Sequence, residues 1–215
     1  MIKKIKICGV KDPKDISVCN ELGIDFIGFN FADISPRKIK PSEADKNNLS
    51  SYCKKIDRVA VFVDPSDQYL DKCIRSIDAT YIQLHGNEST KRCLEIKKMF
   101  NLPIIKAFGI NTVKDLDNAV IYENVVDYFL FDAKPSNENS NQKGGLNKVF
   151  NWEILSNWKG KKFFLAGGIN INNIQSAIND TNAFCIDISS GVEKALGVKD
   201  SNMIKKLYAE FKALV

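Results

Sequence analysis

The sequence predicts an α/β protein, a (β/α)8 TIM barrel made by a single domain that covers residues 1–215. Three observations lead to this prediction. Short segments rich in Val, Ile and Phe recur eight times along the 215 residues, and each is followed by a helix-like segment. The segments are almost continuously apolar, as in parallel strands that are covered on both faces. Eight such units in a chain of this length fit a barrel near the minimum size.

The expected elements follow from this alternation of apolar runs and amphipathic stretches. The predicted strands occupy residues 3–8, 26–31, 58–63, 81–84, 103–107, 127–131, 163–166 and 184–188. The predicted helices occupy residues 14–22, 42–53, 66–76, 89–99, 112–121, 171–178 and 202–214, with a short helix near Trp152. Ser42, Ser66 and Ser89 stand where helix-capping residues are expected.

A doubly wound open sheet is the main alternative, and the glycines argue against it. Such sheets usually have five or six strand–helix units and carry a glycine-rich loop after the first strand. Here the glycine pairs come late, at Gly144-Gly145 and Gly167-Gly168, and no linker divides the chain. The polar segment 135–143 cannot pack into a core. We therefore expect a long mobile loop at residues 133–148, at the barrel rim.

Composition excludes several classes of protein. The net charge is +5, but basic and acidic residues are intermixed, which argues against a nucleic-acid partner. The apolar runs are too short to cross a membrane, and the N-terminal segment lacks the pattern of a signal peptide. None of the six cysteines has CxxC spacing or lies near the single histidine, so no metal site is expected. Scattered thiols indicate a cytoplasmic protein.

Reactive groups of a TIM barrel stand at the carboxyl ends of its strands, and polar residues gather there in this sequence. The candidates are Cys8, Arg37, His85, Asp132 and Asp187. Cys8 could be a base or nucleophile, or a small apolar filler. Asp132 could be a general acid, or a capping carboxylate.

The other candidates also carry two interpretations. Arg37 follows a proline that stiffens its loop, and it could bind a carboxylate or lie solvated on the surface. His85 could transfer protons or be a hydrogen-bonded structural residue. Asp187 lies in an apolar strand, where a charge needs partners, so it indicates a functional group or a buried ion pair.

Two late turns predict a phosphate site. Gly167 and Gly168 follow the seventh strand, and Ser190 and Gly191 follow the eighth. Glycines let backbone N–H groups approach an anion, and the loops after strands seven and eight are the recurrent phosphate position of this fold. The alternative is a pair of tight turns without a ligand.

Together these segments resemble the phosphoribosylanthranilate isomerase family. The matching motifs occur in the family's order and cover the whole chain. They are Lys6-Ile-Cys-Gly9, Ser35-Pro-Arg37, Val61-Phe-Val63, Gln83-Leu-His-Gly86, Leu165-Ala-Gly-Gly168, Asp187-Ile-Ser-Ser-Gly-Val-Glu193 and Gly197-Val-Lys-Asp200.

The resemblance implies a cofactor-free Amadori rearrangement in tryptophan biosynthesis. It converts N-(5-phosphoribosyl)anthranilate to 1-(2-carboxyphenylamino)-1-deoxyribulose 5-phosphate. It implies that Asp132 is the general acid, that Cys8 is the general base and that Arg37 holds the anthranilate carboxylate. By the same resemblance, the two glycine turns hold the phosphate, while His85 and Asp187 contact the ribose or the acid/base pair.

The loop after the sixth strand departs from the family pattern. Leu146 and Val149 lack hydroxyl groups that the family has, and Asn147 replaces a glycine. Asparagine tolerates positive φ, so the turn is expected to persist. Two alternatives stay open: an isomerase of another phosphorylated aminosugar and a non-catalytic phosphate-binding barrel. The expected partner is a small phosphorylated substrate, and the expected state is a monomer or homodimer.

Overall fold

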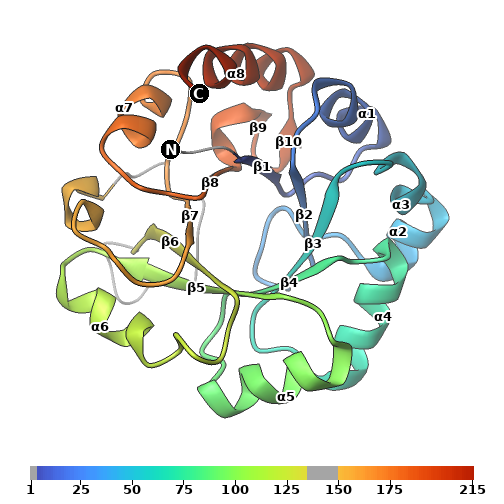
Figure 1. The fold of residues 1–215 in the computed structure, drawn as a ribbon. Helices are drawn as coiled ribbons and strands as arrows, with labels where there is room; N and C mark the ends of the chain where they lie inside the picture. The colour runs from blue at the N-terminus through green and yellow to red at the C-terminus, as the bar shows by residue number, and fades with distance from the viewer. Residues whose placement is uncertain (1–3, 135–149) are drawn as a thin grey trace.

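A computed structural model describes residues 4–134 and 150–215, in which eight parallel strands close into a barrel inside a ring of helices (Figure 1). The barrel strands are β1 (Lys4–Cys8), β2 (Phe26–Asn30), β3 (Asp57–Phe62), β4 (Tyr81–Leu84), β5 (Ile104–Ile110), β6 (Tyr128–Ala133), β7 (Phe163–Leu165) and β8 (Cys185–Ile188). The helices are α1 (Pro13–Leu22), α2 (Pro41–Lys46), α3 (Leu49–Tyr52), α4 (Asp67–Ile77), α5 (Thr90–Phe100), α6 (Lys114–Val120), α7 (Ile174–Asn179) and α8 (Ser201–Leu214). The predicted TIM barrel is confirmed.

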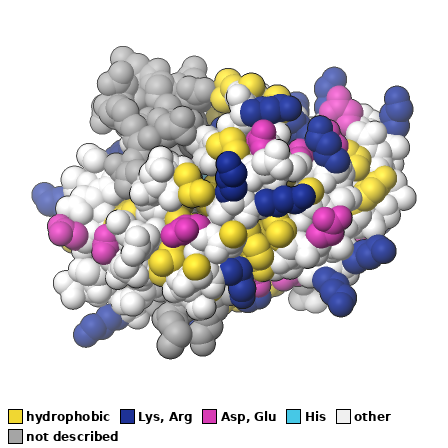
Figure 2. All heavy atoms as spheres, turned by 90° about the horizontal axis from the view of Figure 1, so that it is seen from above, with side chains coloured by type: hydrophobic (Ala, Val, Ile, Leu, Met, Phe, Trp, Pro, Cys, Tyr) yellow, Lys and Arg dark blue, Asp and Glu magenta, His cyan; other side chains and the backbone are white. Residues whose placement is uncertain are grey.

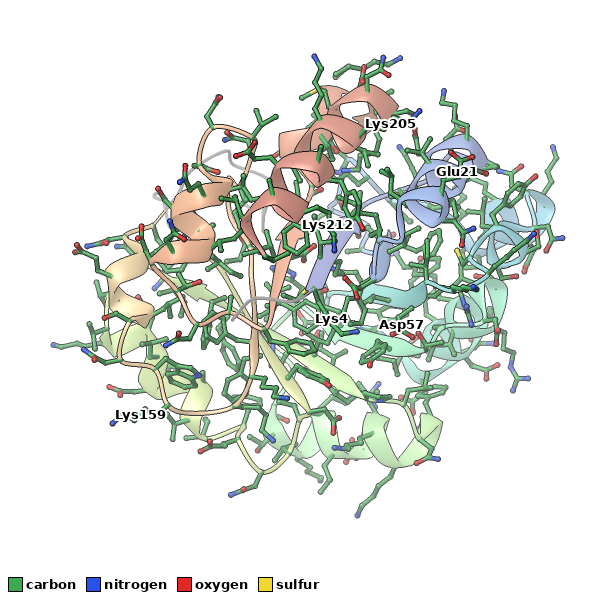
Figure 3. All side chains as sticks on the ribbon, turned by 45° about the horizontal axis from the view of Figure 1, so that its top comes forward. Lys4, Glu21, Asp57, Lys159, Lys205 and Lys212 are labelled. Carbon is green, nitrogen blue, oxygen red and sulfur yellow. The ribbon has the colours of Figure 1, made fainter. Side chains whose placement is uncertain are left out.

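The barrel closes where the first strand pairs with the last. β1 lies parallel to both β2 and β8, and Lys6 is in register with Asp187. All carboxyl ends therefore meet at one rim. Lys4 and Asp57 begin β1 and β3 near the middle of the ring, whereas Glu21 and Lys205 lie on the outer helices (Figure 3).

Two apolar layers explain why the strands are almost continuously hydrophobic. One layer fills the barrel, where the ring of Phe26 packs edge-on against Phe164 with centroids 5.3 Å apart. The other layer lies between the strands and the helices and includes Ile7 and Phe29. Because alternate side chains of a strand point to opposite faces, each strand needs apolar residues at both parities. The side chains that point into the barrel become polar at the carboxyl ends of the strands.

Helix starts agree with the prediction at two of the three expected caps. The hydroxyls of Ser66 and Ser89 accept the N–H groups of Tyr69 and Arg92, as N-caps do. The prediction for Ser42 was wrong: α2 begins after Lys40, whose N–H donates to the Glu43 carboxylate over 3.0 Å.

The single helix predicted at 42–53 is also wrong. Asn48 adopts φ 47°, a left-handed conformation that ends one helical segment before α3 begins. Asparagine enters this region more readily than most residues, so the chain can turn there at little cost.

Sequence patterns missed a hairpin after the eighth strand. Beyond the short 3-10 helix η2 (Ser190–Val192), β9 (Glu193–Ala195) pairs antiparallel with β10 (Val198–Lys199). Gly197 has φ 74° in its turn. After β6, the 3-10 helix η1 (Trp152–Leu155) is the short helix expected near Trp152.

Residues 135–148 of the predicted loop, which include Gly144 and Leu146, lie outside the described residues, and so does Val149. On the side of the molecule that carries α8, basic and acidic side chains are interspersed (Figure 2). In the part of the chain that the structure describes, no helix is long and apolar enough to span a membrane.

Candidate active site

A pocket opens at the carboxyl ends of the strands, at the position where TIM barrels bind substrates. Apolar and polar side chains both line it, as in sites that bind small molecules. Eight of the predicted site residues line it: Cys8, Arg37, His85, Asp132, Gly167, Gly168, Asp187 and Ser190. The fold thus brings together groups that are as much as 182 positions apart in the chain, since the range runs from Cys8 to Ser190.

Cys8 ends β1 with its thiol inside the barrel. Its sulfur lies so close to β2 that a Cβ on Gly28 would come within 2.6 Å of it. Burial raises the pKa of the Cys8 thiol, and the nearby Lys6 ammonium offsets part of that rise. The interpretation of Cys8 as a mere filler leaves its place in the pocket wall unexplained.

Asp132 lies in β6 and lines the same pocket as Cys8. Its Oδ1 accepts the N–H of Ala133 over 2.8 Å, and its Oδ2 lies 3.6 Å from Nε2 of His85. Burial raises the pKa of this carboxyl to about 6, against the smaller lowering effect of the Ala133 hydrogen bond. A carboxyl with that pKa can still carry a proton near neutral pH, as a general acid must.

A chain of polar contacts joins Asp132 of β6 to Asp187 of β8. Nδ1 of His85 lies 3.1 Å from Nε2 of Gln83, whose Oε1 accepts a hydrogen bond from Lys6 over 2.9 Å. Lys6 then donates to Oδ2 of Asp187 over 2.8 Å. Asp187 is therefore in a buried ion pair, as one of its two interpretations expected, and it also lines the pocket. Its functional role stays a prediction.

Lys6 and Gln83 were not singled out from the sequence, although a signal existed. Both are polar residues at inward positions of otherwise apolar strands, the same feature that drew attention to Asp187. Lys6 is completely buried and Gln83 is almost completely buried. The cost of burying such groups without partners makes each of them a marker of a polar site.

Arg37 is buried, so its interpretation as a solvated surface residue is wrong. Its Nε and Nη2 donate to the two carboxylate oxygens of Glu193 over 2.7 and 2.8 Å. Glu193 also accepts a hydrogen bond from Lys199 of β10 over 2.8 Å. The β9–β10 hairpin, which the sequence did not predict, thus orients Arg37. No hydrogen bond joins Nη1 of Arg37 to another described residue, so this nitrogen can donate to a ligand.

The turn at Gly167-Gly168 depends on glycine, and its contact with a phosphate stays a prediction. Gly167 and Gly168 have φ 92° and 66°, which side-chain-bearing residues rarely adopt. A Cβ on Gly167 would lie 2.6 Å from the N–H nitrogen of Ala133, so this turn packs directly behind the Asp132 carboxyl. α7 begins at Ile174 rather than at residue 171. In the segment before it, the side chains of Asn170 and Asn173 donate hydrogen bonds to the Gly168 carbonyl and so hold the turn.

Gly191 is the one predicted site residue that does not line the pocket. A Cβ there would come within 2.1 Å of the Ile169 carbonyl oxygen, so its glycine lets the turns after β7 and β8 pack together. Its contact with a phosphate stays a prediction. Among the described residues, no group of three or more His, Cys, Asp and Glu side chains is arranged to hold a metal ion.

Comparisons with known proteins agree with one another. Residues 5–210 match the family model of N-(5'-phosphoribosyl)anthranilate (PRA) isomerase. The N-(5'-phosphoribosyl)anthranilate isomerase of Rhizobium leguminosarum bv. trifolii is 42% identical over 206 residues, which cover 95% of this chain and 91% of that protein.

Solved structures extend the likeness to the fold. The phosphoribosyl anthranilate isomerase of Thermotoga maritima superposes with a TM-score of 0.87 at 30% identity, with all of both chains covered. A phosphoribosyl anthranilate isomerase in complex with reduced 1-(o-carboxyphenylamino)-1-deoxyribulose 5-phosphate gives a TM-score of 0.84 at 29% identity over the same full coverage. This chain therefore belongs to the N-(5'-phosphoribosyl)anthranilate isomerase family.

Proposed function

We propose that this isomerase rearranges N-(5-phosphoribosyl)anthranilate with Asp132 as the general acid and Cys8 as the general base. The observation that carries the assignment is that both side chains line one pocket, from strands β6 and β1. An aldose-to-ketose shift needs an acid at the ring oxygen and a base at C2. Two groups on different strands of one barrel can flank a single sugar, and each group typically contributes about 10²–10⁴-fold to the rate.

The acid step opens the ribose ring. Asp132 gives its proton to the ring oxygen as the bond from C1 to that oxygen breaks. The lone pair of the anthranilate nitrogen forms the C1=N bond, which leaves a cationic Schiff base and an Asp132 carboxylate. The burial that raises the pKa of Asp132 to about 6 favours this transfer, because it keeps a proton available.

The base step completes the isomerisation. The Cys8 thiolate removes the proton at C2, and the electron pair of that C–H bond forms the C1=C2 bond while the imine electrons return to nitrogen. The resulting enolamine loses its O2 proton and gains a proton at C1, which gives the ketone. These two transfers balance the earlier ones when Cys8 gives up the proton it took and Asp132 regains the one it lost, so both groups are reset. The cationic imine is itself the electron sink for the carbanion, so the protein needs to hold only the acid and the base in place.

The protonation states of the free protein determine how much of it is ready to react. The ring-opening and C2 steps together move one proton from Asp132 to Cys8, and the reset at the end of the turnover reverses this. With a pKa of about 6 for Asp132 and a pKa above the ordinary 9.0 for Cys8, the free protein at neutral pH favours the carboxylate and the thiol. The reactive state, with a protonated Asp132 and an ionised Cys8, is therefore a minor state before substrate binds.

Binding groups surround the acid and the base. We assign the anthranilate carboxylate to Nη1 of Arg37 and the phosphate to the turns at Gly167-Gly168 and Ser190-Gly191. Oδ1 of Asp187 is buried and has no hydrogen-bond partner among the described residues. Such an orphaned acceptor in a pocket wall suits a ribose hydroxyl, which would satisfy it on binding. His85, at 3.6 Å from Asp132, would contact the ribose near the acid.

The assigned role of Arg37 makes Glu193→Gln a test of substrate positioning. Because the amide cannot accept both guanidinium hydrogen bonds, the Arg37 fork loses its fixed orientation. We expect KM for N-(5-phosphoribosyl)anthranilate to rise about tenfold, equivalent to about 1.4 kcal/mol, with a smaller change in kcat. Steady-state kinetics measures both parameters.

A matched control is Asp78→Asn, which removes an arginine–carboxylate pair elsewhere. Asp78 accepts from Arg58 over 2.9 Å at the start of β3, away from the pocket. We expect this variant to keep the KM of the parent protein. An equal rise in KM for both variants would show that general destabilisation, not Arg37, is responsible.

An activity assay with the purified protein tests the substrate assignment itself. The substrate is fluorescent, and we expect its fluorescence to decay when the protein is added. The same protein is then given the aminoaldose of the histidine pathway, the substrate of the alternative isomerase. Turnover of that aminoaldose alone would overturn the proposal, and turnover of neither compound would favour a non-catalytic phosphate-binding barrel.

The remaining parts of the proposal concern the setting of the enzyme. We propose a single-domain protein of the cytoplasm that acts in tryptophan biosynthesis as a monomer or homodimer. All six cysteines are free and buried, which suits a reducing compartment. Its partner is a small phosphorylated substrate, with no nucleic acid and no membrane involved.

A further inference from the structure

The interior of the barrel holds one ammonium group that the steps above do not use. Lys6 is 0% exposed, and its Nζ is fixed by Asp187 at 2.8 Å and by Gln83 at 2.9 Å. Replacing a buried ion pair by apolar residues is often neutral or stabilising. Stability alone therefore gives no reason for a lysine at this position, and the reason is to be sought in the pocket.

The geometry of β1 puts this ammonium next to the proposed base. Lys6 and Cys8 are two residues apart on one strand, so both side chains point into the barrel. Cys8 belongs to the apolar layer inside the barrel, and Asp187, which holds the Lys6 ammonium at 2.8 Å, lines the same pocket as Cys8. A thiolate at Cys8 would thus form directly beside a fixed positive charge.

The other charged groups around Cys8 are few. Lys199 of β10 is a second cation near the thiol, and Asp187 of β8 is the anion that opposes both. Arg37, whose side chain packs against Gly9, and His85 and Asp132 line the same pocket. Of the two nearby cations, Lys199 is already engaged by Glu193 at 2.8 Å and by the Ser189 carbonyl at 2.9 Å.

Lys6 keeps its charge although it is buried. Burial is the largest single effect and lowers the pKa of the Lys6 ammonium, but the attractions of Asp187 and of an ionised Cys8 together outweigh burial and raise that pKa above its ordinary value. Lys6 is therefore a permanent cation throughout the pH range in which the enzyme would work. A cation of this kind favours the charged form of a neighbouring thiol.

We propose that Lys6 is a positioning residue that stabilises the thiolate of Cys8, with its ammonium held beside the sulfur by Asp187 and Gln83. This proposal rests on the proposed role of Cys8 as the base and explains how a buried thiol can ionise at all. Loss of the Lys6 charge is expected to raise the Cys8 pKa by at least about one unit. One unit corresponds to a tenfold smaller thiolate fraction, or about 1.4 kcal/mol.

The test compares the parent protein with a variant that lacks the ion pair. Lys6→Met alone would leave Asp187 as an uncompensated buried charge, so the double variant Lys6→Met/Asp187→Asn is used. The rate of Cys8 alkylation by iodoacetamide is followed across pH, with the Cys8 peptide quantified by mass spectrometry. The other five cysteines are at most 2% exposed, so Cys8 is the accessible thiol in the native protein.

Lys6 acts on the Cys8 thiol more strongly than Asp187 does, so we expect the double variant to have a higher Cys8 pKa than the parent protein. Alkylation at neutral pH should then be slower, by up to about tenfold for one pKa unit. Lys6→Arg keeps the charge and should titrate close to the parent protein. A Cys8 pKa in Lys6→Met/Asp187→Asn that is equal to or lower than that of the parent protein would overturn the proposal.

A second buried ion pair supplies the control. Lys106 and Glu88, 3.1 Å apart, are also almost completely buried. Lys106→Met/Glu88→Gln removes this pair and should leave the Cys8 titration unchanged, and a shift as large as that from Lys6 would count against the proposal. Since alkylation needs no turnover, retained activity in Cys8→Ala would reject the proposed base without affecting this measurement.

Discussion

Asp132→Asn is expected to lower kcat about 10²–10⁴-fold, because an amide has no proton to give to the ring oxygen. The substitution is nearly isosteric, and the Asn Oδ1 can still accept the N–H of Ala133, which lies 2.8 Å away in the parent protein. Steady-state kinetics with N-(5-phosphoribosyl)anthranilate measures the loss. A variant with kcat within threefold of the parent would remove Asp132 from the mechanism.

The pH profile gives the same prediction a second readout. In the parent protein, activity needs a protonated Asp132 and an ionised Cys8. It should rise up to about pH 6, where Asp132 titrates, and then stay level until Cys8 titrates. In Asp132→Asn, the bend near pH 6 should vanish, because the residual rate then follows thiolate formation alone.

Folding provides the control for Asp132→Asn. The folded carboxyl has a pKa of about 6, above its ordinary value of 3.8, so the folded state binds this proton more tightly than the unfolded state does. That group therefore costs the folded state stability as pH rises from about 4 to about 6. At neutral pH the asparagine variant should unfold at a temperature no lower than the parent protein, so lost activity cannot be attributed to unfolding.

Cys8→Ala is expected to cost a similar factor, about 10²–10⁴-fold in kcat, because no other group on β1 can remove the C2 proton. Cys8→Ser should be nearly as inactive, since a hydroxyl ionises far less readily than a thiol. The residual rate of Cys8→Ala should be level below pH 6 and should fall above it, following protonation of Asp132.

Cys185→Ala is the matched control for Cys8→Ala. Cys185 lies in the same apolar layer inside the barrel but does not line the pocket. Its replacement removes the same sulfur atom from the same layer, and we expect kcat to stay near that of the parent protein. A comparable loss in both variants would trace the effect to barrel packing.

The eight strands could be predicted because each combines apolar residues at both parities with a following amphipathic stretch. The same reasoning failed at two local features of the chain. The break at Asn48 depends on one left-handed residue inside a helical pattern. The β9–β10 hairpin is short and mostly exposed, so it carries no periodic apolar signal.

The site shows a similar division. Cys8, Asp132 and Asp187 could be placed at one rim because strand ends converge in a parallel barrel. The partners of these groups could not be assigned, because Lys6 meets Gln83 across 77 residues and Arg37 meets Glu193 across 156 residues. Pairings at such separations are set by barrel closure and register, which a local pattern does not contain.

The seam between β1 and β8 has a consequence for synthesis on the ribosome. Lys6 and Asp187, which meet across that seam, are 181 residues apart in the chain. β1, the strand that carries Cys8, leaves the ribosome early. Its second neighbour, β8, emerges only after nearly the whole chain has been made. Contacts at such separation slow folding, and catalytic competence can arise only as the last step of assembly, after translation is nearly complete.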